Sequence, residues 1–125
     1  MNKVAIIILS DPTNGGEEAF GRAFNGMAAA WDIKQAGGDV TIIFQGAGVR
    51  WPSLITKSDH PLNGLYGLVK GSIEGVSCGC ADAFGATEGA AACGMKVIKD
   101  NPVPGTTGLA SFAKLLKFGT TVLTF

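Results

Sequence analysis

The chain has 125 residues, of which 46% are hydrophobic and 16% charged, and its ten basic residues balance ten acidic ones. This length and apolar content predict one compact domain over residues 1–125 rather than a disordered chain. The balanced charge argues against nucleic acid or a membrane as the main partner. Three cysteines do not make a disulfide framework, and the apolar run Val4–Leu9 is too short for a membrane span, so we expect a cytoplasmic protein.

The first part of the chain predicts two strands separated by a helix. Val4–Leu9 and Val40–Phe44 are continuous apolar runs, which are typical of strands buried on both faces of a sheet. Between them a helix is expected to begin at Glu17, where negative charge suits the helix dipole, and to end before Gly37. The side chains expected on its inward face are Phe20, Phe24, Met27, Ala28 and Trp31.

The same alternation continues to the end of the chain. The expected elements are a glycine-rich helix from Pro61, a strand over Gly75–Cys78, a short helix over Cys80–Phe84, a helix over Glu88–Cys93 capped by Thr87, a strand over Met95–Lys99, a helix capped by Thr107, and a strand over Thr120–Phe125. In the helix after Thr107, the inward side chains are expected to be Leu109, Phe112, Ala113 and Leu116. Together these elements predict an α/β fold: a three-layer α/β/α domain with a mainly parallel five-stranded sheet.

Two cysteines, Cys78 and Cys80, fall where the third predicted strand passes into a helix. The start of a helix favours an anion such as a thiolate, and sites in open α/β sheets form at the carboxyl ends of strands. Both residues are therefore candidates for a reactive thiol. Free cysteine is also an ordinary small buried residue, so packing alone is the alternative for this pair. For Cys93, which lies among alanines near a helix end, packing is the expected role.

Other side chains at the same edge are weaker candidates. Asp11, Arg50 and Trp51 follow strands and are expected to line the site, and the turn Ser10–Gly16 is a possible cradle for a small anion or nucleotide. This turn has neither the dinucleotide fingerprint nor a phosphate-loop sequence. The single histidine, His60, excludes a multi-histidine metal centre, and Cys-x-Cys is not the usual zinc spacing. We expect no cofactor and no metal.

Several segments resemble the DsrE/DsrF-like family, small α/β proteins associated with sulfur relay. The matching segments are Lys3–Asp11, the glycines before Asp39–Phe44, Gly48–Trp51, the cysteine segment Val76–Gly85 and the closing Gly119–Phe125. The resemblance implies a five-stranded parallel sheet, homotrimers or homohexamers, and a cysteine that carries sulfane sulfur as a persulfide. Family members with two cysteines here often have two residues between them, whereas this chain has one. Counting back from the glycine that ends the helix, Cys80 matches the helix-start cysteine, and Cys78 stands close to the strand-end one.

The sequence therefore predicts a small sulfur carrier or sulfurtransferase-like protein with sulfur donor and acceptor proteins as partners. Cys80, or else Cys78, is expected to accept the sulfur at a partly exposed position, and the second cysteine to be able to resolve the persulfide as a strained disulfide. Two alternatives stay open at this point. One is a non-catalytic oligomeric module that binds a small anion or nucleotide at the carboxyl edge of the sheet. The other is a structural oligomer without chemistry.

Overall fold

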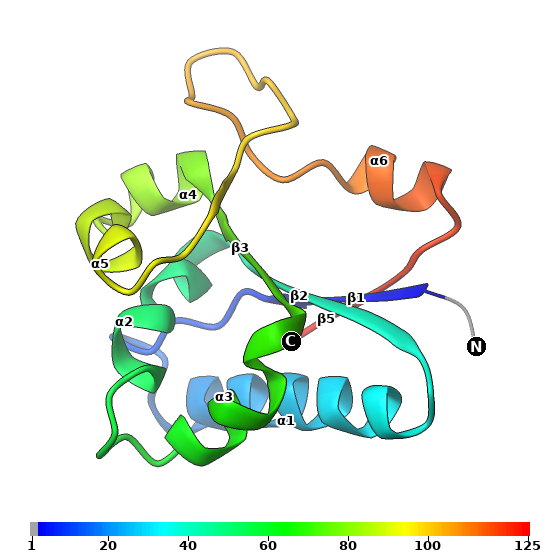
Figure 1. The fold of residues 1–125 in the computed structure, drawn as a ribbon. Coiled ribbons are helices and arrows are strands. Elements are labelled where there is room, and N and C mark those ends of the chain that lie inside the picture. Colours follow the sequence, from blue (N-terminus) through cyan, green and yellow to red (C-terminus); the bar gives the residue numbers. More distant parts are fainter. Residues whose placement is uncertain (1–2) are drawn as a thin grey trace.

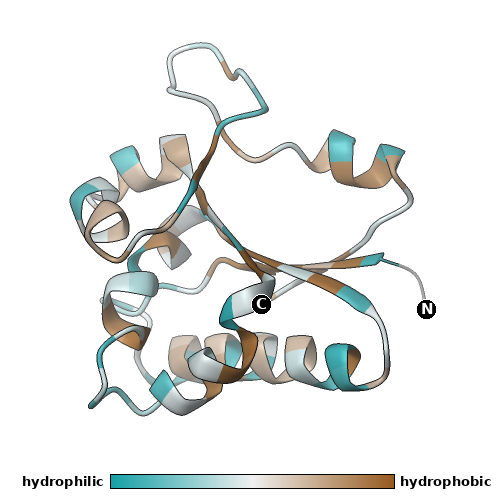
Figure 2. Cartoon of the chain, in the orientation of Figure 1, coloured by the Kyte–Doolittle hydropathy of each residue, from teal (hydrophilic) through white to brown (hydrophobic). Residues whose placement is uncertain are grey.

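The computed structural model describes residues 3–125, and its centre is a five-stranded sheet with helices on both faces (Figure 1). The strands are β1 (Lys3–Ile8), β2 (Asp39–Phe44), β3 (Ile73–Ser77), β4 (Val97–Ile98) and β5 (Thr121–Thr124). They lie in the order β4-β3-β2-β1-β5, and every neighbouring pair is parallel. The predicted three-layer α/β/α architecture is confirmed. The apolar runs supply the buried central strands, which Figure 2 shows in brown.

The helices follow the strands in the alternation that the sequence predicts. The α-helices are α1 (Gly16–Gln35), α2 (Pro52–Ile55), α3 (Asn63–Val69), α4 (Cys78–Ala83), α5 (Thr87–Ala92) and α6 (Phe112–Lys117). Two short 3-10 helices, η1 (Gly46–Arg50) and η2 (Lys70–Ser72), precede α2 and β3. No helix within residues 3–125 is both long enough and apolar enough to cross a membrane.

Small side chains of α1 make its contact with the sheet. The buried residues of this helix are Ala19, Ala23, Gly26, Met27 and Ala30. The predicted inward face is wrong in part, because Phe24 is 46% exposed and Phe20 and Trp31 are only half-buried. The physical reason is close approach: a Cβ at Gly26 would lie only 3.2 Å from the side chains of Ile8 and Phe125. A helix that packs this tightly turns its small residues, and not its bulkiest ones, toward the sheet.

The opposite face of the sheet has a smaller core under α6. Ala5, Ile7, Ile43, Ile98 and Ala110 form this core, with Leu115 packed against it. The predicted inward face of α6 is wrong, because Phe112 and Leu116 are 37% and 63% exposed. The helix also begins later than predicted, with Ser111 rather than Thr107 as its cap: the Ser111 hydroxyl accepts a hydrogen bond from the Lys114 amide. In the helix that begins at Phe112, Leu115 is the side chain that packs against the sheet.

The segment that the sequence predicts as the first turn of the last helix, residues 107–109, is instead the end of a loop over residues 101–109. Asn101 and Leu109 make an antiparallel bridge, with both N–H groups donating to the opposite carbonyl at 2.8 and 2.9 Å. Gly108, at φ +103°, has a backbone conformation that a helix does not allow. Non-local pairing therefore overrides the helical pattern in this segment. The loop rises above α4 in Figure 1.

Two other boundaries differ from the sequence prediction. The glycine-rich helix is shorter than expected, since α3 begins at Asn63 and gives way to η2, so that Ile73 opens β3. Exposed glycines weaken a helix and explain this early end. The fourth strand is only Val97–Ile98 instead of Met95–Lys99. Gly75 lets the Met95–Lys96 backbone come close to β3, because a Cβ there would lie 2.9 Å from the Lys96 carbonyl carbon.

Candidate functional site

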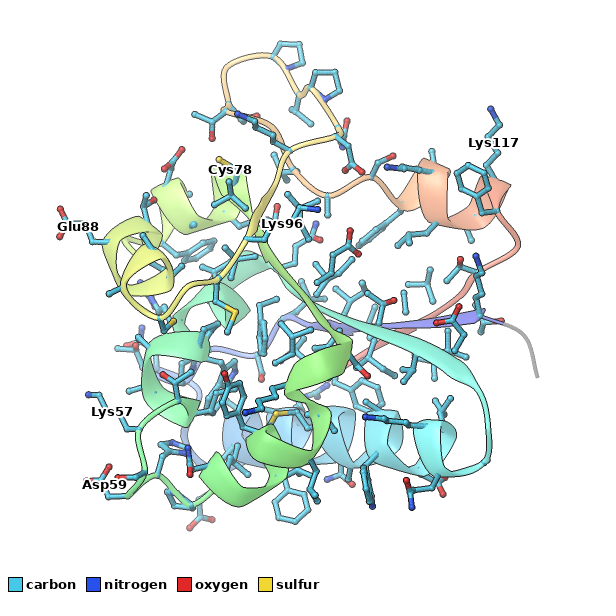
Figure 3. The ribbon with its side chains drawn as sticks, viewed as in Figure 1. Lys57, Asp59, Cys78, Glu88, Lys96 and Lys117 are labelled. Atoms are coloured by element: carbon cyan, nitrogen blue, oxygen red, sulfur yellow. The ribbon has the colours of Figure 1, made fainter. Side chains whose placement is uncertain are left out.

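Cys78 is the first residue of α4 and lies at the carboxyl end of β3 (Figure 3). The preceding residue, Ser77, is extended and fully buried, so the chain turns from strand to helix within one residue. The Cys78 side chain is partly exposed. The thiol is thus accessible, and it stands at the edge of the sheet where α/β proteins form their sites.

Cys80 is buried, with 8% of its surface exposed, and it belongs to the core cluster that includes Val49 and Trp51. The expectation that Cys80 is the partly exposed helix-start thiol is wrong. The helix begins at Cys78, two residues earlier than predicted, so Cys80 falls in the first turn and points toward η1 and the core. Of the two candidates, Cys78 is the one that a reagent can reach.

The two thiols cannot act as a resolving pair while α4 is intact. Residues i and i+2 of an α-helix are separated by roughly 200° around the helix axis, so their side chains do not face each other. Cys78 accordingly points outward and Cys80 inward, and all three cysteines in residues 3–125 are free. A Cys78–Cys80 disulfide would require the first turn of α4 to unwind.

Cys93 lies away from this pair at the end of α5. Its Sγ donates to the carbonyl oxygens of Gly89 and Ala90, at 3.2 and 3.4 Å, so the thiol is bonded back onto its own helix. It is half-buried beside the turn that leads to β4. This arrangement fits the packing role that the sequence predicts for Cys93.

The 101–109 loop is fastened to the start of α4. The Gly79 amide donates to the Gly108 carbonyl at 2.7 Å, and the Ala110 amide donates to the Ser77 hydroxyl at 3.2 Å. One of the free N–H groups of the first turn of α4 is therefore satisfied by the loop. These contacts place an uncharged loop next to Cys78.

Asp82 joins the same loop to α4 and α5, and sequence reasoning did not identify it as a site residue. Its two carboxylate oxygens accept hydrogen bonds from the hydroxyls of Thr107, at 2.6 Å, and Thr87, at 2.7 Å. These two bonds hold the pKa of the Asp82 carboxyl below its ordinary value. Both threonines were predicted to cap helices, whereas they serve this carboxylate. The sequence feature that could have identified Asp82 is its spacing of four residues from Cys78, which places both side chains on one face of a helix.

Arg50 lies at the other end of α4 from Cys78. Its Nε donates to the Phe84 carbonyl at 3.0 Å, its Nη1 pairs with Asp11 at 3.1 Å, and its guanidinium lies 5.4 Å from the centre of the Phe84 ring. A cation at this end satisfies a terminal carbonyl and complements the helix dipole. Arg50 is thus committed to holding α4 in place and is not directed at Cys78.

Trp51 and Asp11 also serve structure at this edge. Trp51 is buried, and its indole N–H donates to the Ser10 carbonyl at 2.9 Å. Asp11 accepts hydrogen bonds from the side chain of Asn14 and the amide of Thr13, which lower the pKa of its carboxyl, with a smaller contribution from Arg50. Two donors of the 10–16 turn, the Thr13 amide and the Asn14 side chain, are therefore occupied by a carboxylate of the turn itself. This geometry adds no support to the anion-binding alternative.

The structure also bears on metal ligands. Within residues 3–125, no three His, Cys, Asp or Glu side chains come together in a group that could hold a metal ion. His60, instead, accepts a hydrogen bond at Nδ1 from the Leu62 amide and packs its ring edge-on to Trp51. The histidine thus has a local structural role at the entry to α3.

Comparison with known proteins supports the fold. No protein-family model matches the chain, and no curated protein matches it significantly. A conserved protein of unknown function from Bacteroides thetaiotaomicron has a similar solved structure, with a TM-score of 0.62 and 20% sequence identity over 98% of this chain and 94% of that chain. At this identity the likeness shows a shared architecture over nearly the whole length of both chains.

Proposed function

We propose that this protein is a small sulfur carrier, similar to the DsrE/DsrF-like family, which holds sulfane sulfur as a persulfide on Cys78. The observation that carries the proposal is the contrast among the three thiols. Cys80 is buried, whereas Cys78 and Cys93 are both partly exposed; of these two, Cys78 stands at a strand-to-helix junction and Cys93 is bonded back to its own helix. A carrier thiol must meet both a donor and an acceptor, and Cys78 has the accessibility for that task.

The transfer consists of two thiol–persulfide exchanges. The Cys78 thiolate attacks the outer sulfur of a donor persulfide, R–S–SH, so that the new S–S bond forms while the donor bond breaks and R–S⁻ leaves. A thiolate of the acceptor then attacks the outer sulfur held on Cys78 and becomes the new persulfide. Cys78 returns as a thiolate, and no external oxidant or reductant is consumed.

The proposal assigns the sulfur to Cys78 rather than to Cys80. Sequence comparison matched Cys80 to the helix-start position, but burial now favours Cys78. Because the two side chains point in different directions around α4, a single sulfur is exchanged at Cys78 without a resolving partner in the same chain. Cys80 contributes apolar packing under η1.

We also propose that the protein works in the cytoplasm as a homotrimer or homohexamer. The exposed apolar side chains of Phe112, Leu116 and Phe118 on or beside α6 support assembly, because single domains rarely leave several large apolar groups of one element in water. Multi-angle light scattering tests this state. A monomer at all concentrations would contradict it.

Loading with a persulfide tests the function directly. The reduced protein is treated with glutathione persulfide, and intact-mass and peptide spectra are searched for one added sulfur atom. We expect the addition on the peptide that contains Cys78, with loss in Cys78→Ser and retention in Cys80→Ser and Cys93→Ser. Full loading of Cys78→Ser would refute the assignment, as would no loading of the wild type either by this donor or by the cationic persulfide of cysteamine.

A further inference from the structure

Asp82 lies one helical turn after Cys78, on the same face of α4. Side chains at i and i+4 of a helix have Cβ atoms about 5–6 Å apart. Asp82 is exposed, as Cys78 is in part, so a reagent that reaches the thiol also meets the carboxylate. In Figure 3 Cys78 stands at the loop-facing end of α4.

The carboxylate has a fixed position rather than a free side chain. Thr107 binds one oxygen and Thr87 binds the other, so the group is held between the 101–109 loop and α5. A shallow groove of about 560 Å³ runs between α4 and the loop. Its lining residues are Gly79, Asp82, Ala83, Gly105, Thr106 and Thr107. Asp82 is therefore the charged group of an otherwise neutral, small-residue groove that begins at Gly79, the residue after Cys78.

We propose that Asp82 is a specificity-determining residue that selects persulfides and thiols carrying a cationic group close to the reacting sulfur. This inference rests on the proposed function of Cys78 as the sulfur-carrying thiol. A substrate ammonium group in the groove is attracted by the fixed carboxylate, while a carboxylate or sulfonate on the substrate is repelled. Small aminothiols and a basic residue beside a partner's cysteine both present that chemistry.

The size of the preference follows from Coulomb's law. For charges about 6 Å apart in water, the interaction changes the reaction rate about threefold for each unit charge on the substrate, and hence about tenfold between a cation and an anion. Screening at physiological salt reduces that ratio to about threefold. Lys99, an exposed residue whose backbone packs against Gly108 at the foot of the loop, is a cation that competes with Asp82. If the charge of Lys99 outweighed that of Asp82 at Cys78, anionic reagents would react faster than cationic ones.

Methanethiosulfonates of different charge measure the preference without any persulfide. The Cys78 thiolate attacks the sulfenyl sulfur, forms a mixed disulfide and releases methanesulfinate. The rates for the aminoethyl, hydroxyethyl and sulfonatoethyl reagents are read at the Cys78 peptide by mass spectrometry. At low ionic strength we expect the aminoethyl reagent to react about tenfold faster than the sulfonatoethyl reagent, after correction for their rates with a free thiol. The ratio should fall to about threefold at physiological salt.

Two substitutions separate the effect of Asp82 from the net charge of the protein. Asp82→Asn keeps a carbonyl acceptor and adds an amide that can donate to a threonine hydroxyl, so the groove retains its hydrogen bonds while the charge is lost. Asp59→Asn changes the net charge equally at an exposed site, which Figure 3 shows at the opposite end of the molecule from Cys78. The charge ratio should collapse in Asp82→Asn alone. An unchanged ratio in Asp82→Asn, or a wild-type ratio that does not respond to salt, would overturn the proposal.

Persulfide loading then shows whether the cation comes from a small aminothiol or from a basic residue of a partner protein. It also separates the role of Asp82 from the role of Cys78 as sulfur carrier. Three donors are compared: the persulfide of cysteamine as the small cation, that of a Lys-Cys peptide as the partner-like cation, and that of 3-mercaptopropionate as the anion. If cysteamine persulfide loads fastest, a small aminothiol is the favoured substrate, and if the peptide persulfide loads fastest, a basic partner protein is. Loading with no charge preference overturns the role of Asp82 and leaves the sulfur carrier standing. No loading by any donor, with the methanethiosulfonate preference intact, overturns the sulfur carrier and leaves charge selection at Cys78 supported.

Discussion

Gly48 is the point at which η1 comes closest to β1, and an added methyl group there tests this packing. A Cβ on Gly48 would overlap the Ile8 carbonyl oxygen and lie 2.8 Å from its carbonyl carbon. Gly48 is buried between β1 and the core. Two and three residues further on, Arg50 and Trp51 make the hydrogen bonds that tie η1 to the 10–11 segment. Gly48→Ala therefore pushes η1 off the end of the sheet.

The expected loss in the free energy of unfolding follows from the backbone that the added methyl group must displace. Overpacking a well-packed interior costs about 1–3 kcal/mol and occasionally more, and here the obstacle is backbone that no side-chain rotation relieves. We expect Gly48→Ala to lose about 3 kcal/mol, a large part of the roughly 5–15 kcal/mol typical of a domain. Gly67 is the matched control: it is an exposed position within α3, and a Cβ there meets nothing within 4 Å. Gly67→Ala should gain about 0.5–1 kcal/mol.

Urea denaturation followed by circular dichroism measures both variants. With a slope of about 2 kcal/mol per molar urea, the midpoint of Gly48→Ala should fall by about 1.5 M, and that of Gly67→Ala should rise slightly. Tryptophan fluorescence gives a second probe, because Trp51 is buried next to η1. A wild-type midpoint for Gly48→Ala would refute the close approach of η1 to β1.

Three further predictions concern the thiols, acid stability and α6. Iodoacetamide should alkylate Cys78 faster than Cys80, which is buried, and faster than Cys93, whose thiol is bonded to its own helix. Peptide mapping that finds Cys80 or Cys93 modified first would contradict this order. Because the pKa of Asp82 is lower in the folded protein, its carboxylate stabilises the fold above the unfolded-state pKa of about 3.9, and this stability is lost as the pH falls through the folded-state pKa. The urea midpoint should therefore drop less between pH 5 and pH 3 in Asp82→Asn than in the wild type. Equal drops would argue against the hydrogen bonds from the two threonines. Ser111→Ala removes the cap of α6 and should cost about 1 kcal/mol by the same urea assay, whereas no change would place the start of the helix elsewhere.

The fold class could be predicted from the sequence because it depends on local patterns. Continuous apolar runs such as Val4–Leu9 and Val40–Phe44 match strands buried on both faces, and turn residues separate them from helices. The placement of Cys78 at a strand–helix junction follows in the same way. Parallel strands align their carboxyl ends, so a residue after one strand lies at the common edge wherever the strand is in the sheet.

The orientation of individual side chains was decided by tertiary packing. Periodicity marks which residues are apolar, but it does not say how close a helix lies to the sheet. Gly26 allows α1 to pack so tightly that Phe24 is left in water. In the cysteine segment, starting α4 two residues early exchanges the roles of Cys78 and Cys80, because a two-residue step reverses the direction of a side chain on a helix.

The composition of the site depended on contacts between residues far apart in the chain. The sequence predicts Thr107 as a helix cap, but its hydroxyl donates a hydrogen bond to Asp82, 25 residues away. The reason is that the bridge between Asn101 and Leu109 folds the 101–109 segment into a loop that lies over α4. Arg50 binds Asp11 and the end of α4 across separations of 39 and 34 residues. The sequence by itself determined the sheet, its helices and the position of the cysteine pair. Only the tertiary structure decided which thiol faces water and which carboxylate stands beside it, because burial and long-range hydrogen bonds are properties of the packed chain.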